Sequence, residues 1–300
     1  MSNTPPDPLP GIGQIVQQYG LRAVKKLGQH FLFDLNLTHK MVQLSGIQST
    51  DLVFEIGPGP GGLTRPLLAI AARVCVIETD PQFLKHLAEL GPYFDTQLDI
   101  HIGDALRFDL DDLSQQQPYH VVANLPYNVG TALLVKWLTA KNPKWQSLTL
   151  MFQLEVAERI TAKAGERPYG RLSILTAAMA RAQIIMRVPA SAFTPPPKVT
   201  SAVVHLTPLP PSNQYPDLEG LAHITGLAFG QRRKMLRASL KPLAAGLSMP
   251  VSDWLHQNNI APTARPETLT PQQFMQLATS ISTTGPRPPR RGPAFSSKTP

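Results

Sequence analysis

The sequence predicts an α/β fold in which polar residues follow the strands of a parallel sheet. Short apolar runs alternate with a glycine-rich turn, a stretch of helical spacing and single acidic or amide residues between residues 52 and 127. From residue 218 to about residue 281 the apolar spacing becomes helical only. The chain is therefore expected to carry a smaller C-terminal α-helical domain.

Leu52–Ile56 has the composition of a short buried strand, and it leads into a glycine-rich turn at Gly57–Gly62. Leu63–Ala72 then continues with helical spacing. A strand, a glycine turn and a helix in succession bring a ligand against backbone N–H groups at a helix N-terminus. The pattern predicts a nucleotide-like cofactor, but nicotinamide-binding and S-adenosylmethionine-binding proteins share it.

Acidic residues follow the next two predicted strands. Arg73–Ile77 is followed by Glu78, which is placed to accept hydrogen bonds from the two hydroxyls of a ribose. Leu98–Ile102 is followed by Asp104, which could accept a hydrogen bond from the amino group of an adenine. The alternative for Asp104 is a helix N-cap or an Asx turn.

The fourth predicted strand, His120–Ala123, leads into Asn-Leu-Pro-Tyr. An adenine N6 amine is a poor nucleophile until its N–H groups are held by acceptors, and Asn124 offers a side-chain oxygen for this. Leu125 offers a backbone oxygen in a turn that Pro126 makes rigid. Tyr127 offers a face on which a purine can stack, which is worth roughly 1–3 kcal/mol per base. The alternative is an ordinary connection between a strand and a helix.

The order of these groups along the chain favours a single site. In open α/β sheets, ligands bind outside the carboxyl ends of the strands, so the turn, the two acids and the tetrapeptide can converge on one crevice. The sequence therefore predicts a cofactor that contains a ribose on one side of this crevice and an exocyclic amine to be modified on the other.

A set of short motifs between residues 25 and 280 is typical of one enzyme family. The motifs are Lys26–Leu32, Glu55–Gly61, Ile77–Asp80, Gly103–Ala105, Asn124–Asn128, Phe193–Val199 and Phe229–Lys234. With these motifs the chain resembles the S-adenosylmethionine-dependent small-subunit (16S) rRNA adenine N6,N6-dimethyltransferases. The resemblance implies a Rossmann-like class I methyltransferase sheet with a small C-terminal all-α domain.

The resemblance also implies roles for individual residues. The implied cofactor-binding residues are His30, Leu32, Gly57, Glu78, Asp104 and Asn124. The implied catalytic residues are Asn124, Leu125, Pro126, Tyr127 and Phe193, with Tyr127 and Phe193 on opposite faces of the target base. Two positions depart from the family pattern: His30 stands where many members have Asn, and Gly130 stands where many have Ser.

The implied reaction transfers methyl groups from S-adenosylmethionine to N6 of two adjacent adenines in the 3′-terminal hairpin of 16S rRNA. The product is N6,N6-dimethyladenosine, and the implied partner is an assembly intermediate of the 30S subunit. A monomer is the default oligomeric state. The alternatives are a 23S rRNA adenine methyltransferase of the macrolide-resistance type and a noncatalytic ribosome-assembly factor. A nicotinamide dehydrogenase would leave the tetrapeptide unexplained.

Composition agrees with an RNA partner. The net charge is +8 and the isoelectric point is about 9.7, which favours a polyanion. A basic cluster is expected to contact RNA phosphates, with a solvated surface as the alternative: Arg232, Arg233, Lys234, Arg237 and Lys241. The single cysteine, Cys75, is expected to be a buried apolar residue, and neither a disulfide framework nor a metal site is expected. These features suit the cytoplasm.

The sequence also predicts how the chain is divided. No apolar run approaches the roughly 18 residues of a membrane span, so no membrane association is expected. The predicted parts are a disordered N-terminus (1–20), a catalytic domain with an N-terminal arm (21–207), a Pro-rich linker (208–217), a helical rRNA-binding domain (218–282) and a disordered basic tail (283–300).

Overall fold

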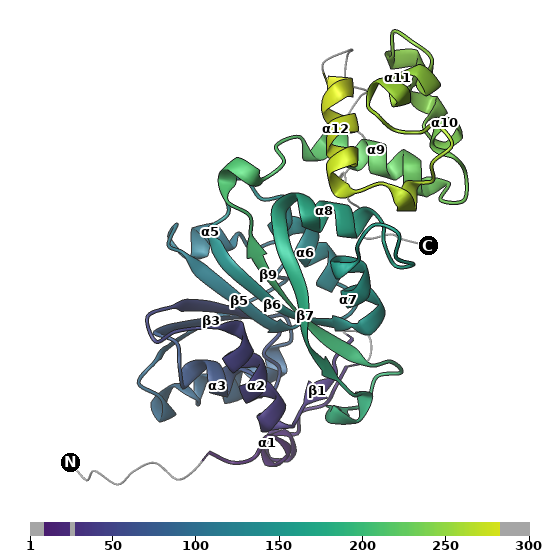
Figure 1. The fold of residues 1–300 in the computed structure, drawn as a ribbon. Helices are drawn as coiled ribbons and strands as arrows, with labels where there is room; N and C mark the ends of the chain where they lie inside the picture. The colour runs from purple at the N-terminus through teal and green to yellow at the C-terminus, as the bar shows by residue number, and fades with distance from the viewer. Residues whose placement is uncertain (1–8, 25–27, 283–300) are drawn as a thin grey trace, which may run out of the picture. The chain divides into compact units, whose positions relative to one another are not determined.

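A seven-stranded sheet organises the first part of the chain in a computed structural model that describes residues 9–24 and 28–282 (Figure 1). In their order across the sheet, the strands are β4 (Gln97–Ile102), β3 (Arg73–Glu78), β2 (Leu52–Ile56), β5 (Tyr119–Asn124), β6 (Trp145–Gln153), β9 (Ser201–Pro208) and β7 (Ala180–Val188). Neighbouring strands from β4 to β6 are parallel, and β9 is antiparallel to β6. The predicted α/β class is confirmed.

Contacts within the chain define two units. Among the described residues, the first unit consists of those up to Ala157 and of Gln183–Thr207, and the second consists of Glu158–Ala182 and those from Pro208 onward. The second unit therefore includes a segment that the sequence analysis assigned to the catalytic domain. The predicted disordered tail, 283–300, lies outside the described residues.

Helices lie on both sides of the sheet in the first unit. They are α1 (Ile12–Gln18), α2 (Leu35–Ser45), α3 (Thr64–Leu68), α4 (Leu84–Ala88), α5 (Leu110–Leu113) and α6 (Gly130–Leu138). Figure 1 shows α2 and α3 on one side of the sheet and α5 and α6 on the other. A separate two-stranded sheet pairs β1 (Phe31–Leu32) with β8 (Phe193–Thr194) in antiparallel orientation.

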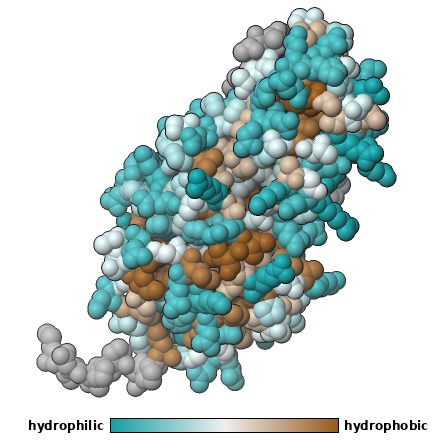
Figure 2. Space-filling model, in the orientation of Figure 1, coloured by the Kyte–Doolittle hydropathy of each residue, from teal (hydrophilic) through white to brown (hydrophobic). Residues whose placement is uncertain are grey.

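Strand β2 is buried along its whole length. Helices on both faces of a parallel sheet exclude water, which is why such a strand is apolar in the sequence at every position except Glu55. Within the sheet, the ring of Phe54 packs edge-on against Tyr119 of β5, with 5.1 Å between ring centroids. Figure 2 shows hydrophilic side chains over most of the visible surface, with smaller apolar groups between them.

The strands expected from the sequence are all present, but the helix expected over Leu63–Ala72 is shorter. Helix α3 covers only Thr64–Leu68. The backbone amides of Ala72 and Arg73 donate to the carbonyl oxygen of Asp51, at 3.1 and 3.3 Å. These two bonds turn the chain toward β3, so the helix cannot continue.

The prediction that residues 1–20 are disordered is wrong for Ile12–Gln18, which form helix α1. Ile12 and Ile15 lie on the same face of this helix, and each is only 3% exposed. Burial of these two side chains stabilises a segment whose flanking prolines suggested disorder. Residues 1–8 lie outside the described part of the chain.

The second unit is helical. It contains the second half of α7 (Leu154–Thr161), then α8 (Arg171–Met179), α9 (Leu218–Gly230), α10 (Leu236–Ser239), α11 (Val251–Gln257) and α12 (Pro271–Ser282). Helices α8, α9 and α12 pack against one another. Trp254, Leu255 and Phe274 are all buried in it.

The residues expected to form a Pro-rich linker are hydrogen-bonded to the end of α8. The amide of Leu209 donates to Met179 O at 2.9 Å, and the amide of Tyr215 donates to Ala178 O at 3.0 Å. These bonds hold the segment between β9 and α9 against the second unit. No helix among residues 9–24 and 28–282 is both long enough and apolar enough to span a membrane.

Tyr169 joins two parts of the second unit that are distant in sequence. Its ring lies 6.1 Å from that of Phe229, measured between centroids, and the ring of Phe229 lies 5.7 Å from that of Phe274. The Tyr169 hydroxyl donates to the carbonyl oxygen of Leu269 at 2.8 Å. This buried contact explains why residues 158–182 belong to the helical unit.

Replacing Tyr169 by Phe is expected to lower the free energy of unfolding by about 1–2 kcal/mol, because the buried Leu269 carbonyl loses its donor. Urea denaturation followed by circular dichroism measures this loss. Tyr93→Phe is the matched control, since Tyr93 is 38% exposed, and it should leave the free energy of unfolding nearly unchanged. Equal losses in the two variants would contradict the prediction.

Candidate active site

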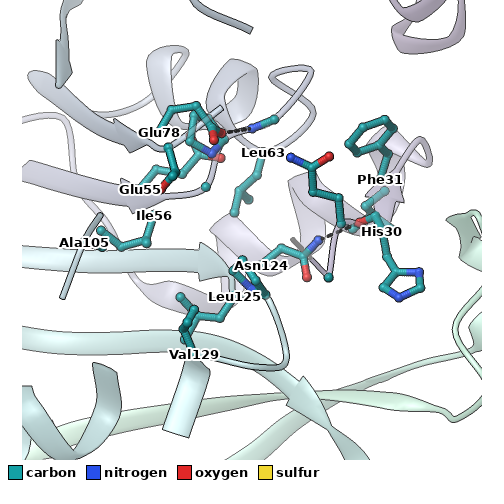
Figure 3. Close-up of a pocket in the computed structure, with 18 of the residues that line it drawn as sticks. His30, Phe31, Glu55, Ile56, Leu63, Glu78, Ala105, Asn124, Leu125 and Val129 are labelled. Carbon is teal, nitrogen blue, oxygen red and sulfur yellow. Dashed lines mark hydrogen bonds between the residues drawn. The ribbon is translucent and has the colours of Figure 1, made fainter. Parts of the chain in front are cut away.

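A cavity of about 270 Å³ lies at the carboxyl ends of β2, β3 and β5 and beside the loop after β4 (Figure 3). The predicted site residues that line it are His30, Leu32, Gly57, Glu78, Asp104, Asn124, Leu125, Pro126 and Tyr127. Phe193 is the one predicted site residue that is not part of the lining. The predicted convergence of four strand ends on one crevice is thus what the structure shows.

The glycine turn after β2 adopts a backbone conformation that requires glycine. Gly57, Gly59 and Gly61 have φ angles of 68°, 54° and 82°, which residues other than glycine rarely adopt. At Gly62 the constraint is space, because an added Cβ would lie 2.7 Å from the carbonyl oxygen of Leu32. The turn therefore presents bare backbone to the cavity, which allows a ligand to approach closely.

Glu78 lies at the end of β3 with its carboxylate held by backbone amides. Oε2 accepts from Gly59 N at 3.1 Å, and Oε1 accepts from Asp80 N at 2.8 Å. The side chain is 5% exposed, and burial raises the pKa of its carboxyl group. Each oxygen has a second lone pair, so the carboxylate can still accept from the hydroxyls of a ribose.

Asp104 forms an Asx turn and also lines the cavity. Its Oδ1 accepts from Leu106 N at 2.9 Å, and its carbonyl oxygen accepts from Arg107 N at 2.9 Å. The Asx turn that the sequence analysis gave as the alternative for Asp104 is therefore present. It does not conflict with adenine binding, because Oδ2 has no hydrogen bond within the described residues.

The side chain of Asn124 is oriented by the N-terminal arm. Its Nδ2 donates to the carbonyl oxygen of His30 at 3.3 Å. This contact assigns the amide orientation and leaves Oδ1 without a hydrogen bond in the described part of the chain. Oδ1 is therefore available as an acceptor for an amine in the cavity.

The rest of the tetrapeptide is fixed by its neighbours. The carbonyl oxygen of Pro126 accepts from the amides of Val129 and Gly130, both at 3.1 Å. The Tyr127 hydroxyl is 2.6 Å from Ser201 Oγ, and burial raises the pKa of Tyr127. Gly130 begins helix α6 normally, so its departure from the family pattern does not disturb the turn.

The side chain of His30 contacts the Phe193–Val199 segment. Its Nδ1 donates to the carbonyl oxygen of Pro195 at 2.7 Å, and its ring lies 5.5 Å from that of Tyr127. In Figure 3 the ring points away from Glu78 and Glu55. The backbone of His30, through its contact with Asn124, is what reaches toward the cofactor cavity.

Phe193 is 3% exposed and belongs to the main hydrophobic core. It lies in β8, directly opposite Leu32 of β1, and this pairing holds the residue among buried side chains. Its stacking against a target base stays a prediction.

Glu55 is a site residue that the sequence analysis missed. It lines the cavity at 1% exposure, and its Oε2 has no hydrogen bond within the described residues. Burial raises the pKa of Glu55 to about 8. The available signal was an acidic residue inside the apolar run Leu52–Ile56, directly before the glycine turn.

S-adenosylmethionine fits the polar groups that line this cavity. An unpaired, buried carboxyl oxygen suits a ligand that carries positive charge. Glu78 and Asp104 supply acceptors at separate points of the same cavity, and the glycine turn supplies open backbone between them. The chemistry and order of these groups match a sulfonium nucleoside with a ribose and an adenine.

The fold and the site together define a class I S-adenosylmethionine-dependent methyltransferase. A dimethyladenosine transferase from Plasmodium falciparum has a similar structure, with a TM-score of 0.74 and 27% identity over 85% of this chain and 98% of that chain. The 23S rRNA methyltransferase ErmE shares the fold, with a TM-score of 0.64 and 23% identity over 84% of this chain and 100% of that chain.

Sequence comparison identifies the family. The family described as "Ribosomal RNA adenine dimethylase" matches residues 20–283. A "Ribosomal RNA small subunit methyltransferase A" from Rhizobium johnstonii is 49% identical over 279 residues, which is 92% of this chain and 98% of that protein. The chain therefore belongs to the ribosomal RNA adenine dimethylase family, whose members are S-adenosylmethionine-dependent rRNA adenine dimethyltransferases. The resemblance found in the sequence is confirmed.

In the ligand-free protein, Glu55→Gln is expected to raise the free energy of unfolding by an amount that grows with pH. The pKa of Glu55 rises from 4.5 to about 8 on folding, so the unfolded chain loses this proton first and the native protein loses stability between these values. The amide cannot ionise. The difference between variant and native protein should grow by up to about 1.4 kcal/mol per pH unit in that window.

Urea denaturation at a series of pH values across this window measures the difference. Glu219→Gln is the matched control, because Glu219 is exposed and its variant should follow the pH dependence of the native protein. If Glu55→Gln and the native protein gave parallel curves, the protonated buried carboxyl group would be ruled out.

Proposed function

We propose that this enzyme transfers methyl groups from S-adenosylmethionine to N6 of two adjacent adenines in the 3′-terminal hairpin of 16S rRNA. The product is N6,N6-dimethyladenosine, formed during assembly of the 30S subunit. The observation that carries the proposal is the orientation of Asn124, whose amide nitrogen is held by His30 O while its oxygen remains available in the cofactor cavity.

The chemistry of the site is mainly the positioning of an amine. Bound S-adenosylmethionine supplies an electrophilic methyl group. Asn124 Oδ1 and the carbonyl oxygen of Leu125 accept the N–H groups of the target amine, and this directs its lone pair toward the cofactor. Tyr127, held by Ser201, supplies a face on which the target base can stack. No strong base is needed, because the amine reacts as a neutral nucleophile and the methylated cation that forms is acidic enough to lose its proton to water.

The proposed substrate is an assembly intermediate of the small subunit, bound by a monomer in the cytoplasm. The similarity to a protein named for the small subunit, at 49% identity, favours this substrate over 23S rRNA. The structure of ErmE, at 23% identity, supports only the shared fold. A noncatalytic assembly factor would not need the pocket-facing acceptor on Asn124.

The helical unit is proposed to bind rRNA. Four basic residues are exposed and suited to phosphate contact: Arg233, Lys234, Arg237 and Lys241. Arg232 is different, because it donates to Arg167 O at 2.8 Å and lies 4.0 Å from Glu267. It is assigned to stabilising the helical unit, not to the RNA contact.

Asn124→Ala is expected to lower kcat on the order of a hundredfold, because one acceptor for the target amine is lost. Affinity for RNA should change little, since the phosphate contacts lie elsewhere. The measurement is transfer of labelled methyl groups to small subunits that lack adenine methylation, followed by nucleoside analysis. Asn36→Ala is the matched control, because Asn36 is exposed on α2.

Dimethyladenosine at two adjacent 3′-terminal positions, lost in Asn124→Ala, would support the proposal. Label found only in large-subunit RNA would favour the macrolide-resistance type of enzyme. Binding of S-adenosylmethionine without transfer to either RNA would favour a noncatalytic assembly factor.

A further inference from the structure

Lys136 makes hydrogen bonds that have no role in the proposed reaction. It lies on α6, and its Nζ donates to the carbonyl oxygens of Leu106, at 2.9 Å, of Ala105, at 3.4 Å, and of Phe108. An ammonium group has three N–H donors, so this set of carbonyl oxygens satisfies all of them. The side chain is half-buried, and burial lowers the pKa of Lys136 while nearby Asp109 and Asp104 raise it.

The three carbonyl oxygens belong to the loop that carries Asp104. Without a cation between them, their negative ends would face one another, which disfavours this conformation of the loop. The start of the loop is tied to the end of β3, because Gly103 N donates to Glu78 O at 2.8 Å and Thr79 Oγ1 donates to Gly103 O at 2.9 Å. Within the loop, Leu106 N donates to Asp104 Oδ1. Lys136 adds a contact from helix α6 to the part of the loop that follows Asp104.

Helix α6 is a rigid support for this contact. It begins directly after the Asn-Leu-Pro-Tyr segment, and Leu133, Leu134 and Trp137 are buried. Its last turn is held by a hydrogen bond of 3.2 Å from Trp145 Nε1 to Trp137 O. Leu133 and Ala105 both line the cavity, so the helix and the loop form two sides of the same site.

We infer that Lys136 is a positioning residue that sets specificity for the adenine of the cofactor, by holding the Asp104 loop in the conformation that binds the 6-amino group. This inference rests on the proposed function, in which Asp104 accepts from that amino group. The lysine does not contact the cofactor itself. Its effect is on the loop, so it should change the choice between ligands that differ only at that position.

The test is calorimetric binding of two ligands to the full chain. S-adenosylhomocysteine carries the 6-amino group, and S-inosylhomocysteine carries a carbonyl oxygen in its place. Lys136→Met keeps the length of the side chain but removes the charge and all three donors. We expect it to weaken S-adenosylhomocysteine binding about tenfold, with little change for S-inosylhomocysteine. The preference for the amino ligand should fall by the same factor.

Three further variants make the result specific. Lys136→Arg keeps the charge and should retain part of the preference. Lys141→Met removes an exposed lysine that follows α6 and should retain all of it. Asp104→Asn removes the acceptor directly and should abolish the preference. Melting temperatures of the ligand-free variants separate a change in selectivity from a loss of folded protein.

Equal weakening of both ligands by Lys136→Met, or an unchanged preference, would overturn the inference. If Asp104→Asn abolished the preference and Lys136→Met did not, only the role of Lys136 would fail, and the proposed function would stand. If the native protein bound neither ligand, or bound both equally, the role of Asp104 would fail and the inference would fail with it.

Discussion

The parallel pairing of β2 with β3 and β5 is the constraint on which the rest of the site depends. Ile56 pairs with Ile77, and Phe54 pairs with Val121, so the three strands end at the same edge of the sheet. The residues that follow them are then neighbours in space although they are distant in sequence. A shift in this register would separate the glycine turn, Glu78 and Asn124, and no local change could bring them together again.

Burial raises the pKa of two acidic groups of this site, Glu55 and Glu78. Glu78 is satisfied by two backbone amides, whereas Oε2 of Glu55 has no hydrogen bond within the described residues. Burial of the Glu55 carboxyl group favours its protonated form, so the empty cavity destabilises a negative charge that a cationic ligand would stabilise. Glu55 is therefore the acidic group of this site whose ionisation would cost the ligand-free fold stability.

Two contacts from outside the sheet edge complete the site. The N-terminal arm orients the Asn124 amide through His30 O, and α6 holds the loop after β4 through Lys136. Both join segments that are far apart in sequence. Asn124 and the Asp104 loop, at two sides of the cavity, are each held by a contact from another part of the chain, which suits a reaction that depends on alignment.

The sequence by itself determined the strands, the glycine turn, and the residues that follow each strand, because runs of apolar residues and the positions of glycines are local signals. It also identified Glu78, Asp104 and Asn124, whose positions at strand ends are fixed by sheet topology. Only the tertiary structure decided the state of Glu55, the burial of Phe193 and the assignment of Tyr169 to the helical unit. These depend on which side chains surround a residue after folding, and a linear pattern carries no information on such distant neighbours.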